Sequence, residues 1–289
     1  MQIIGKLGPI DVGDNVGTRL MAVMNLSPTS FYKGSFKKTE NEIQSYIEQV
    51  IDTGADFLDV GAISSAPTFL YEKREFASIT TEIERFSFFF NVYKEIGADI
   101  PISIDTQSSK VADYCLTQGA MIINDISGFK SDPKIVDVIS NYSASAIVMA
   151  CRQIPGDVFT IKDVLEELKH SIILGVNAGI EKSRIVIDPG LGGWVPQRQI
   201  DDDYKLIKHL SKLRELEQCI LVGISRKSFI GKVLNVSPEK RLWGSLAATT
   251  VAILNGTHII RTHDVKPTRD VCLITDYLKK ILDDQGNNK

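Results

Sequence analysis

The chain has 289 residues, of which 43% are hydrophobic and 24% are charged, and its formal net charge at pH 7 is -3. This composition is typical of a globular protein, and the charge provides no general attraction to nucleic acid or to acidic membranes. The four cysteines lie far apart in the sequence, which argues against a disulfide framework or a structural zinc site. Because the sequence shows no signal-peptide pattern and no apolar run near the roughly 18 residues of a membrane span, we expect a cytoplasmic protein.

Short apolar segments alternate with segments of helical periodicity along most of the chain. Residues 1–19 predict a β-hairpin that could plug the bottom of a barrel. Strands are expected at residues 20–25, 56–61, 101–106, 120–125, 144–150, 185–188, 219–224 and 257–265. Helices are expected at residues 41–54, 80–97, 108–119, 133–143, 161–178, 201–216, 244–254 and 267–284. About eight strand–helix units predict a single (β/α)8 TIM-barrel domain over residues 1–289, ahead of an open doubly wound sheet, because no GxGxxG follows the first strand.

Polar residues recur where these strands end. Alone, each would more often be a helix cap or a loop contact, but the recurrence at the same end of so many strands favours a pocket. The mixture of carboxylates, amides and basic groups suits a flat polar heterocycle bearing an anionic group, with Asp188 accepting two parallel N–H bonds and Asn124 both donating and accepting. Met149 would provide a polarizable wall. The strand-end residues are Asn25, Asp59, Asp105, Asn124, Met149, Asp188, Lys227, Arg261 and His263.

Basic groups are concentrated near the end of the chain. The segment Ser225-Arg226-Lys227 follows the seventh strand, and Arg261 and His263 belong to the eighth. Barrels commonly bind phosphate after these two strands, so a diphosphate is favoured over a solvated basic turn. Asn25 would then be an oxygen ligand for a magnesium ion carried in by the diphosphate. The histidine spacing predicts no zinc site, and no catalytic Ser/His/Asp or Cys/His triad can be assembled.

Seven segments, in order, resemble dihydropteroate synthase, a family of pterin-binding TIM-barrel enzymes. They are MAVMNLSPTSFYKG (residues 21–34), ISIDT (102–106), IINDISG (122–128), IDPGLG (187–192), LVGISRKSFIG (221–231), GSLAATT (244–250) and RTHDV (261–265). The resemblance implies a transferase that condenses a dihydropterin hydroxymethyl diphosphate with an arylamine, usually p-aminobenzoate, and releases diphosphate. It also implies a homodimer formed through the helix at residues 241–254 and the C-terminal helix.

The resemblance also implies roles for individual residues. Asp105, Asn124, Asp188 and Lys227 would hold the pterin ring, with Met149 as a further contact. Asn25, Arg261 and His263 would hold the diphosphate and its magnesium ion, Asn25 as the metal ligand and Ser225 as an additional donor. Asp105, Lys227 and Arg261 would be the catalytic residues. Positioning and electrostatic stabilisation would dominate the reaction, because a neutral arylamine needs no strong general base to attack.

The chain departs from the family pattern at several loop positions. Thr29 replaces an acidic residue in the first loop, Ala66 an arginine in the second, and Ala150 a histidine after the fifth strand. Gly193 and Val195 replace a phenylalanine and a lysine. One interpretation is a different arylamine, such as the ribosylated, phosphorylated arylamine of methanopterin-type cofactors. The alternatives are a pterin-dependent methyltransferase and a non-catalytic pterin-binding paralogue.

Overall fold

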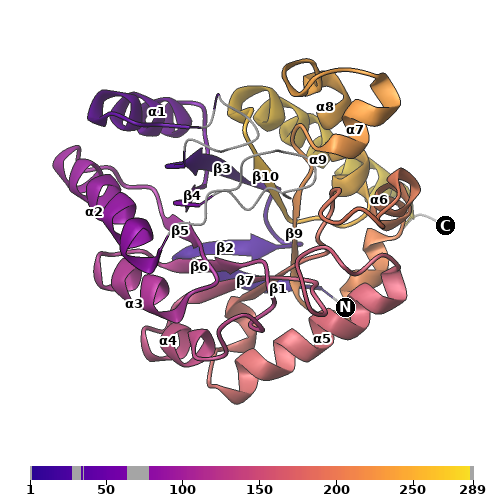
Figure 1. Ribbon diagram of the computed structural model, residues 1–289. Helices are drawn as coiled ribbons and strands as arrows, with labels where there is room; N and C mark the ends of the chain where they lie inside the picture. The colour runs from indigo at the N-terminus through magenta and orange to yellow at the C-terminus, as the bar shows by residue number, and fades with distance from the viewer. Residues whose placement is uncertain (1, 28–33, 35, 64–77, 287–289) are drawn as a thin grey trace.

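A closed barrel of eight parallel strands forms the centre of the protein (Figure 1). The computed structural model describes residues 2–27, 34, 36–63 and 78–286, and it confirms the predicted (β/α)8 architecture. Around the barrel the order is β10-β3-β4-β5-β6-β7-β8-β9. The strands are β3 (Arg19–Asn25), β4 (Phe57–Gly61), β5 (Ile102–Asp105), β6 (Ile122–Asp125), β7 (Ser145–Met149), β8 (Ile185–Asp188), β9 (Cys219–Gly223) and β10 (Ile259–Thr262).

Helices surround the barrel (Figure 1). Several begin where a Ser or Thr side chain accepts a hydrogen bond from a first-turn N–H, as Thr39, Ser78, Ser108 and Thr160 do. No helix in the described part of the chain is long and apolar enough to cross a membrane. The helices are α1 (Glu40–Asp52), α2 (Ile79–Glu95), α3 (Ser109–Thr117), α4 (Ile135–Asn141), α5 (Ile161–Asn177), α6 (Ile200–Lys208), α7 (Ser228–Leu234), α8 (Leu242–Leu254) and α9 (Val265–Gly286).

Two helical segments differ from the sequence-based expectation. The expected helix over residues 201–216 is α6 followed by the 3-10 helix η3 (Leu210–Leu216). At the junction, the His209 N–H is shared between the Lys205 and Leu206 carbonyls, which is typical of a transition to 3-10 geometry. The additional helix α7 was not expected, because its seven residues span about two turns and leave little periodicity in the sequence.

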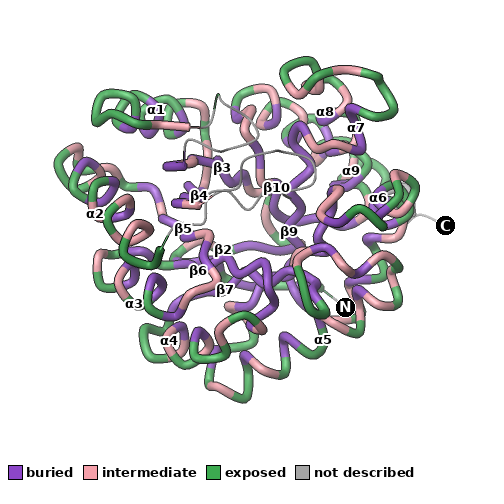
Figure 2. The backbone as a smooth tube through the Cα atoms, in the orientation of Figure 1, coloured by how far each residue is buried: buried purple, intermediate pink, exposed green. Residues whose placement is uncertain are grey.

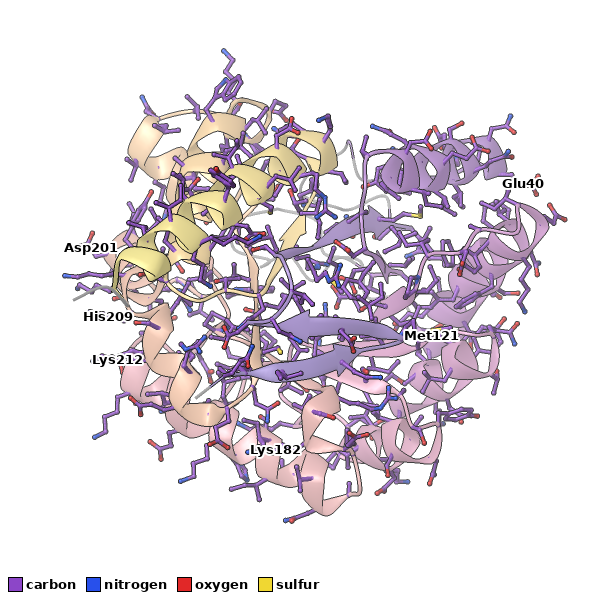
Figure 3. All side chains as sticks on the ribbon, turned by 180° about the vertical axis from the view of Figure 1, so that it is seen from behind. Glu40, Met121, Lys182, Asp201, His209 and Lys212 are labelled. Carbon is purple, nitrogen blue, oxygen red and sulfur yellow. The ribbon has the colours of Figure 1, made fainter. Side chains whose placement is uncertain are left out.

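The predicted N-terminal hairpin is present as β1 (Ile4–Leu7) and β2 (Ile10–Gly13). It lies across one end of the barrel, in front of the strands when the molecule is viewed from behind (Figure 3). Leu7 and Val12 are fully buried there, and the Gly8 N–H donates to Ser145 Oγ at 2.9 Å. The hairpin therefore closes the bottom of the barrel, as the sequence suggested.

The interior of the barrel has two chemically different levels, both within the buried central region of Figure 2. Alternate strand residues point inward, and the others pack against the helices. We call the inward residues beside the hairpin the lower layer: Met21, Phe57, Ile122, Ile147, Val186, Leu221 and Ile259. We call those nearer the carboxyl ends of the strands the upper layer: Asn25, Asp59, Asp105, Asn124, Met149, Asp188 and Arg261.

Candidate active site

Asp59 is the centre of a hydrogen-bonded network in the upper layer. Its side chain is fully buried, and its Oδ2 accepts from Arg261 Nε at 2.6 Å and from Asn124 Nδ2 at 3.2 Å. Its Oδ1 accepts from Ser103 Oγ at 2.6 Å. These three donors compensate for the burial of the carboxylate. Asp59 therefore holds Arg261 and Asn124 in place, a role that sequence reasoning missed because pairing between strands is not visible in the sequence.

Arg261 also reaches a second carboxylate. Its Nη2 lies 3.3 Å from Asp105 Oδ2. Burial, and then the charge of Asp59, raise the pKa of Asp105 although Arg261 opposes the shift. Burial disfavours the charged form of Arg261, but the charges of Asp59 and Asp105 outweigh this effect and raise the pKa of Arg261. The guanidinium is therefore a permanent cation, whereas Asp105 loses its proton at a higher pH than an exposed aspartate does.

Asp188 ends β8 and has one oxygen engaged in a turn. The Gly190 N–H donates to Oδ1 at 2.8 Å, while no described residue donates to the second oxygen. Gly190 has φ +74°, and a Cβ there would lie 3.1 Å from Met149 Cγ, so this turn requires glycine. Burial raises the pKa of Asp188, and the nearby charge of Lys227 opposes the shift. Asp188 thus makes a loop contact and can still accept a ligand N–H.

Lys227 follows β9 and directs its ammonium group toward the loop after β8. Its Nζ donates to the Leu191 carbonyl and lies 4.7 Å from the centroid of the Trp194 ring. Burial lowers the pKa of Lys227 to about 8, although the charge of Asp188 favours the ammonium form. Lys227 is therefore protonated at neutral pH and within electrostatic range of Asp188.

The neighbouring residues Ser225 and Arg226 connect the loops after β9 and β10. Arg226 has φ +57° and donates to both oxygens of Asp264 at 2.9 and 2.7 Å. Ser225 Oγ accepts from the His263 N–H at 3.2 Å and lies 3.4 Å from Asp264 Oδ2. Arg226 therefore fixes the two loops to each other. Ser225 also joins these two loops. Its contact with a substrate remains a prediction.

His263 is a neutral group in this environment. Burial, and then the charges of Arg261, Arg226 and Lys227, lower its pKa to about 3. At neutral pH the imidazole therefore supplies hydrogen bonding rather than a third positive charge beside Arg261 and Lys227.

Asn25 ends β3 beside Gly61, its partner in β4. The two residues pack closely, since a Cβ on Gly61 would lie 3.5 Å from Asn25 Oδ1. In the described ranges no three His, Cys, Asp or Glu side chains are grouped so as to hold a metal ion. A single amide oxygen fits a magnesium ion only if substrate oxygens complete its coordination, which is how Mg²⁺ often binds phosphates.

The structure brings the predicted residues to one end of the barrel. Asp105 lies beside Asn124 in the strand register, and Met149 beside Asp188. Ala150, where the family pattern has histidine, is buried directly after β7. The departures at Thr29 and Ala66 lie outside the described residues. The roles of the predicted residues toward a substrate remain predictions.

Comparison with known proteins places these residues in a family context. A family model described as "Pterin binding enzyme" matches residues 21–263. A dihydropteroate synthase of Clostridium beijerinckii is 33% identical over 274 residues, which is 94% of this chain and 98% of that protein. A Coxiella burnetii dihydropteroate synthase solved with pteroic acid superposes with a TM-score of 0.83 at 30% identity, covering 96% of this chain and 99% of that one.

A second solved structure extends the comparison. A Xanthomonas albilineans dihydropteroate synthase with 4-aminobenzoic acid has a TM-score of 0.80 at 26% identity, covering 96% of this chain and 99% of that one. The similarity thus extends over nearly the full length of both chains, and the matched region includes every strand of the barrel except the first two residues of β3. The chain belongs to the dihydropteroate synthase family of pterin-binding enzymes, which are transferases.

Proposed function

We propose that this protein condenses a dihydropterin hydroxymethyl diphosphate with an arylamine and releases diphosphate. The observation that carries the proposal is the upper layer, in which hydrogen-bond acceptors for a heterocycle lie beside the permanent cation Arg261 and the ammonium of Lys227. Family membership supports it, as do the relatives solved with pteroic acid and with 4-aminobenzoic acid.

The pterin ring would bind against Asp188 and Asn124. The second oxygen of Asp188 can accept an N–H from the guanidine-like edge of the ring, and Met149 forms the wall behind it. The Asn124 amide is oriented by its bond to Asp59. A ring held at fixed positions places its exocyclic carbon in a constant orientation, which lowers the entropic part of the barrier.

The diphosphate would face Arg261, His263 and the loops after β9 and β10. In the reaction, the bond between the exocyclic carbon and the diphosphate oxygen breaks, and its electron pair leaves with the diphosphate. The arylamine nitrogen forms the new bond to carbon and then loses a proton to water. Arg261 stabilises the negative charge that develops on the leaving oxygen, and it needs no reorganisation because Asp59 and Asp105 already hold it.

We propose Mg²⁺ as the accompanying ion, with Asn25 as its protein ligand. Bound there, the ion would neutralise part of the diphosphate charge. The position of Asn25 at the carboxyl end of β3 supports this assignment. Because the described residues contain no group of three His, Cys, Asp or Glu side chains that could hold a metal ion, the substrate would supply most of the coordination.

The test is a diphosphate-release assay with the pterin diphosphate, Mg²⁺ and a panel of arylamines. We expect release only when an arylamine is present, and the panel contains p-aminobenzoate and the ribosylated, phosphorylated arylamine because the loop departures affect the arylamine side. If neither arylamine supports diphosphate release, the proposal is contradicted. Tight pterin binding without turnover would instead indicate a non-catalytic paralogue, and methyl transfer from a methyl-tetrahydropterin to a corrinoid would indicate a methyltransferase.

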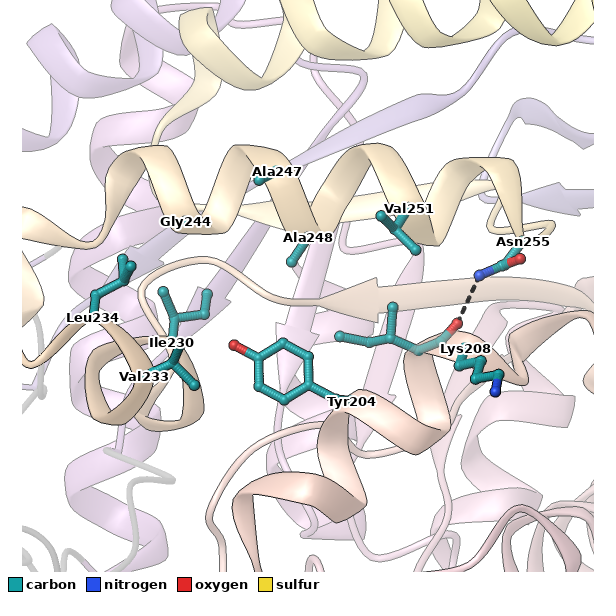
Figure 4. Close-up of a pocket in the computed structure, with 11 residues that line it drawn as sticks. Tyr204, Lys208, Ile230, Val233, Leu234, Gly244, Ala247, Ala248, Val251 and Asn255 are labelled. Atoms are coloured by element: carbon teal, nitrogen blue, oxygen red, sulfur yellow. Dashed lines mark hydrogen bonds between the residues drawn. The ribbon is translucent and has the colours of Figure 1, made fainter.

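We also propose that the protein forms a homodimer through α8 and α9. Both helices expose large apolar side chains, including Trp243, Ile274 and Tyr277 at 76%, 65% and 66% exposure. Beside them, α6, α7 and α8 form a groove of about 450 Å³ in which Ala248 and Val251 lie opposite Tyr204 (Figure 4). Sedimentation should give a dimer for the unmodified chain and a monomer for Ile274→Asp. A monomeric unmodified chain at micromolar concentration would contradict this proposal.

A further inference from the structure

We infer that Trp194 is a positioning residue that holds the Lys227 ammonium beside the upper layer, and that Gly156 provides the space for the indole ring of Trp194. The inference rests on the proposed function, in which Lys227 contacts the pterin. Trp194 lies in the segment Gly193-Trp194-Val195, where the chain departs from the family pattern, so the role belongs to this chain's own sequence.

Trp194 and Lys227 meet at one carbonyl group. The Leu191 carbonyl accepts from Trp194 Nε1 at 2.9 Å and also from Lys227 Nζ. The same Nζ lies 4.7 Å from the indole centroid, within the range of a cation–π interaction. A Cβ on Gly192 would lie 2.7 Å from Lys227 Cδ, so the lysine stem runs along the backbone of this loop. The ammonium is therefore fixed from one side by the carbonyl and from another by the ring.

The ring itself occupies a site that only glycine permits. Gly156, in the loop after β7, has φ +82°, and a Cβ there would lie 1.9 Å from Trp194 Cβ and 2.4 Å from its Cγ. The loop around Gly156 is rigidly built, because Asp157 accepts from the N–H groups of Arg152, Gln153 and Ile154 at 2.8, 2.8 and 3.1 Å. The contact between Gly156 and Trp194 is thus a defined packing contact between two loops.

A buried ion pair fixes these two loops relative to each other. Arg198 and Asp203 are almost fully buried, with Nη2 and Oδ1 2.8 Å apart. Asp203 Oδ1 also accepts from the Gly192 N–H at 2.7 Å, and Arg198 Nη1 donates to the Val158 carbonyl at 3.1 Å. The loops carrying Trp194 and Gly156 are therefore anchored before any ligand arrives, which is the preorganisation that a positioning residue needs.

A double-mutant cycle tests whether Trp194 acts through Lys227. Calorimetry would measure pterin affinity for the unmodified chain, Trp194→Leu, Lys227→Met and the double variant. We expect Trp194→Leu to weaken binding by about 5- to 10-fold when Lys227 is present, and by less than about 2-fold in the Lys227→Met background, because the cation–π partner is then absent. An equal loss in both backgrounds would overturn the inference.

Three further variants keep the result interpretable. Trp194→Phe retains an aromatic face and should restore most of the affinity, whereas Gly156→Ala should reproduce the loss by displacing the ring. Trp243→Phe replaces the other tryptophan of the chain, exposed on α8, and should leave the pterin affinity unchanged. A Trp194→Phe variant as weak as Trp194→Leu would also overturn the inference. An unmodified chain that binds no pterin would instead contradict the proposed function.

Discussion

The upper and lower layers of the barrel interior come from the same strands but have opposite chemistry. The lower layer is apolar and is covered by the hairpin, so its side chains are satisfied by packing alone. The upper layer buries carboxylates beside a guanidinium and an ammonium group, an arrangement with a high desolvation cost. The difference indicates that the lower layer stabilises the barrel, whereas the buried charges of the upper layer lower its stability but are positioned to bind a ligand.

Two carboxylates at opposite ends of the barrel show the same contrast. Near the hairpin, Arg214 donates to both oxygens of Asp14 at 2.9 and 2.8 Å, and the Ile3 N–H adds a further bond. Burial would raise the pKa of Asp14, but these bonds outweigh it and hold the pKa well below its usual range. In the upper layer, by contrast, one oxygen of Asp188 accepts no hydrogen bond from the described residues. Both oxygens of Asp14 are thus hydrogen-bonded within the protein, whereas the second oxygen of Asp188 can accept an N–H from a ligand.

The largest expected effect comes from removing the upper-layer cation. Arg261→Met removes the guanidinium that stabilises the leaving diphosphate, so we expect kcat/KM to fall about 10³-fold, which corresponds to roughly 4 kcal/mol of lost transition-state stabilisation. The matched variant Arg214→Met should lower the free energy of unfolding by about 1–2 kcal/mol and leave kcat/KM unchanged. Steady-state kinetics and urea unfolding measure these effects in both variants. An equal loss of kcat/KM in Arg261→Met and Arg214→Met would contradict the functional difference between the two ends of the barrel.

A cavity in the lower layer should affect stability alone. Phe57 is fully buried among the side chains under the hairpin, and Phe57→Ala should lower the free energy of unfolding by about 3–4 kcal/mol. The KM for the pterin diphosphate should stay within about 2-fold of the unmodified value, because the upper layer keeps its own hydrogen bonds. A large rise in KM with little loss of stability would show that the layers are not separate.

Removing the ammonium group beside the upper layer should increase stability. Lys227→Met replaces a buried ammonium with an apolar side chain, and we expect a gain on the order of 1–2 kcal/mol together with loss of turnover. Because the pKa of Lys227 is about 8 when folded and 10.5 ordinarily, the unmodified protein regains stability as the pH rises from 8 to 10.5. The difference between the two proteins in chemical unfolding should therefore shrink over that range. A constant difference would contradict the assignment.

The smallest effect concerns pH and activity. Lys227 loses its proton above about pH 8, so kcat/KM for the pterin diphosphate should fall on the alkaline side from that value. The pKa of Asp105 is raised by burial and by Asp59, so the acid limb should lie above the ordinary range of an aspartate. A pH–rate profile that stays flat up to pH 9.5 would exclude a protonated Lys227 from the mechanism.

The sequence was sufficient to predict that the strand-end residues lie together, because the parallel strands of a barrel bring their carboxyl ends to one side. It placed Asp105, Asn124, Asp188, Lys227 and Arg261 at the same end of the barrel, where the structure has them, while their roles toward a substrate remain predictions. The barrel fold followed from the count of strand–helix units. The resemblance contributed the family, which the comparisons confirm.

The contacts between distant loops could not be predicted. Asp59 was named only as a strand-end residue, because its bonds to Arg261 and Asn124 join residues 202 and 65 positions away. The contact of Trp194 with Gly156 likewise depends on two loop conformations that no periodicity encodes. The only indication of these contacts in the sequence was the presence of glycine at positions 156 and 192. A glycine in a loop does not show which side chain occupies the space beside it.

The pterin site is tested by the affinity of a pterin for the Asp188→Asn variant, measured by calorimetry alongside the melting temperature of the variant. The amide would place an N–H₂ group where the ring needs an acceptor, so we expect at least about 100-fold weaker binding in a protein that remains folded. An unchanged affinity in the folded variant would contradict the claim that the upper layer is the pterin site.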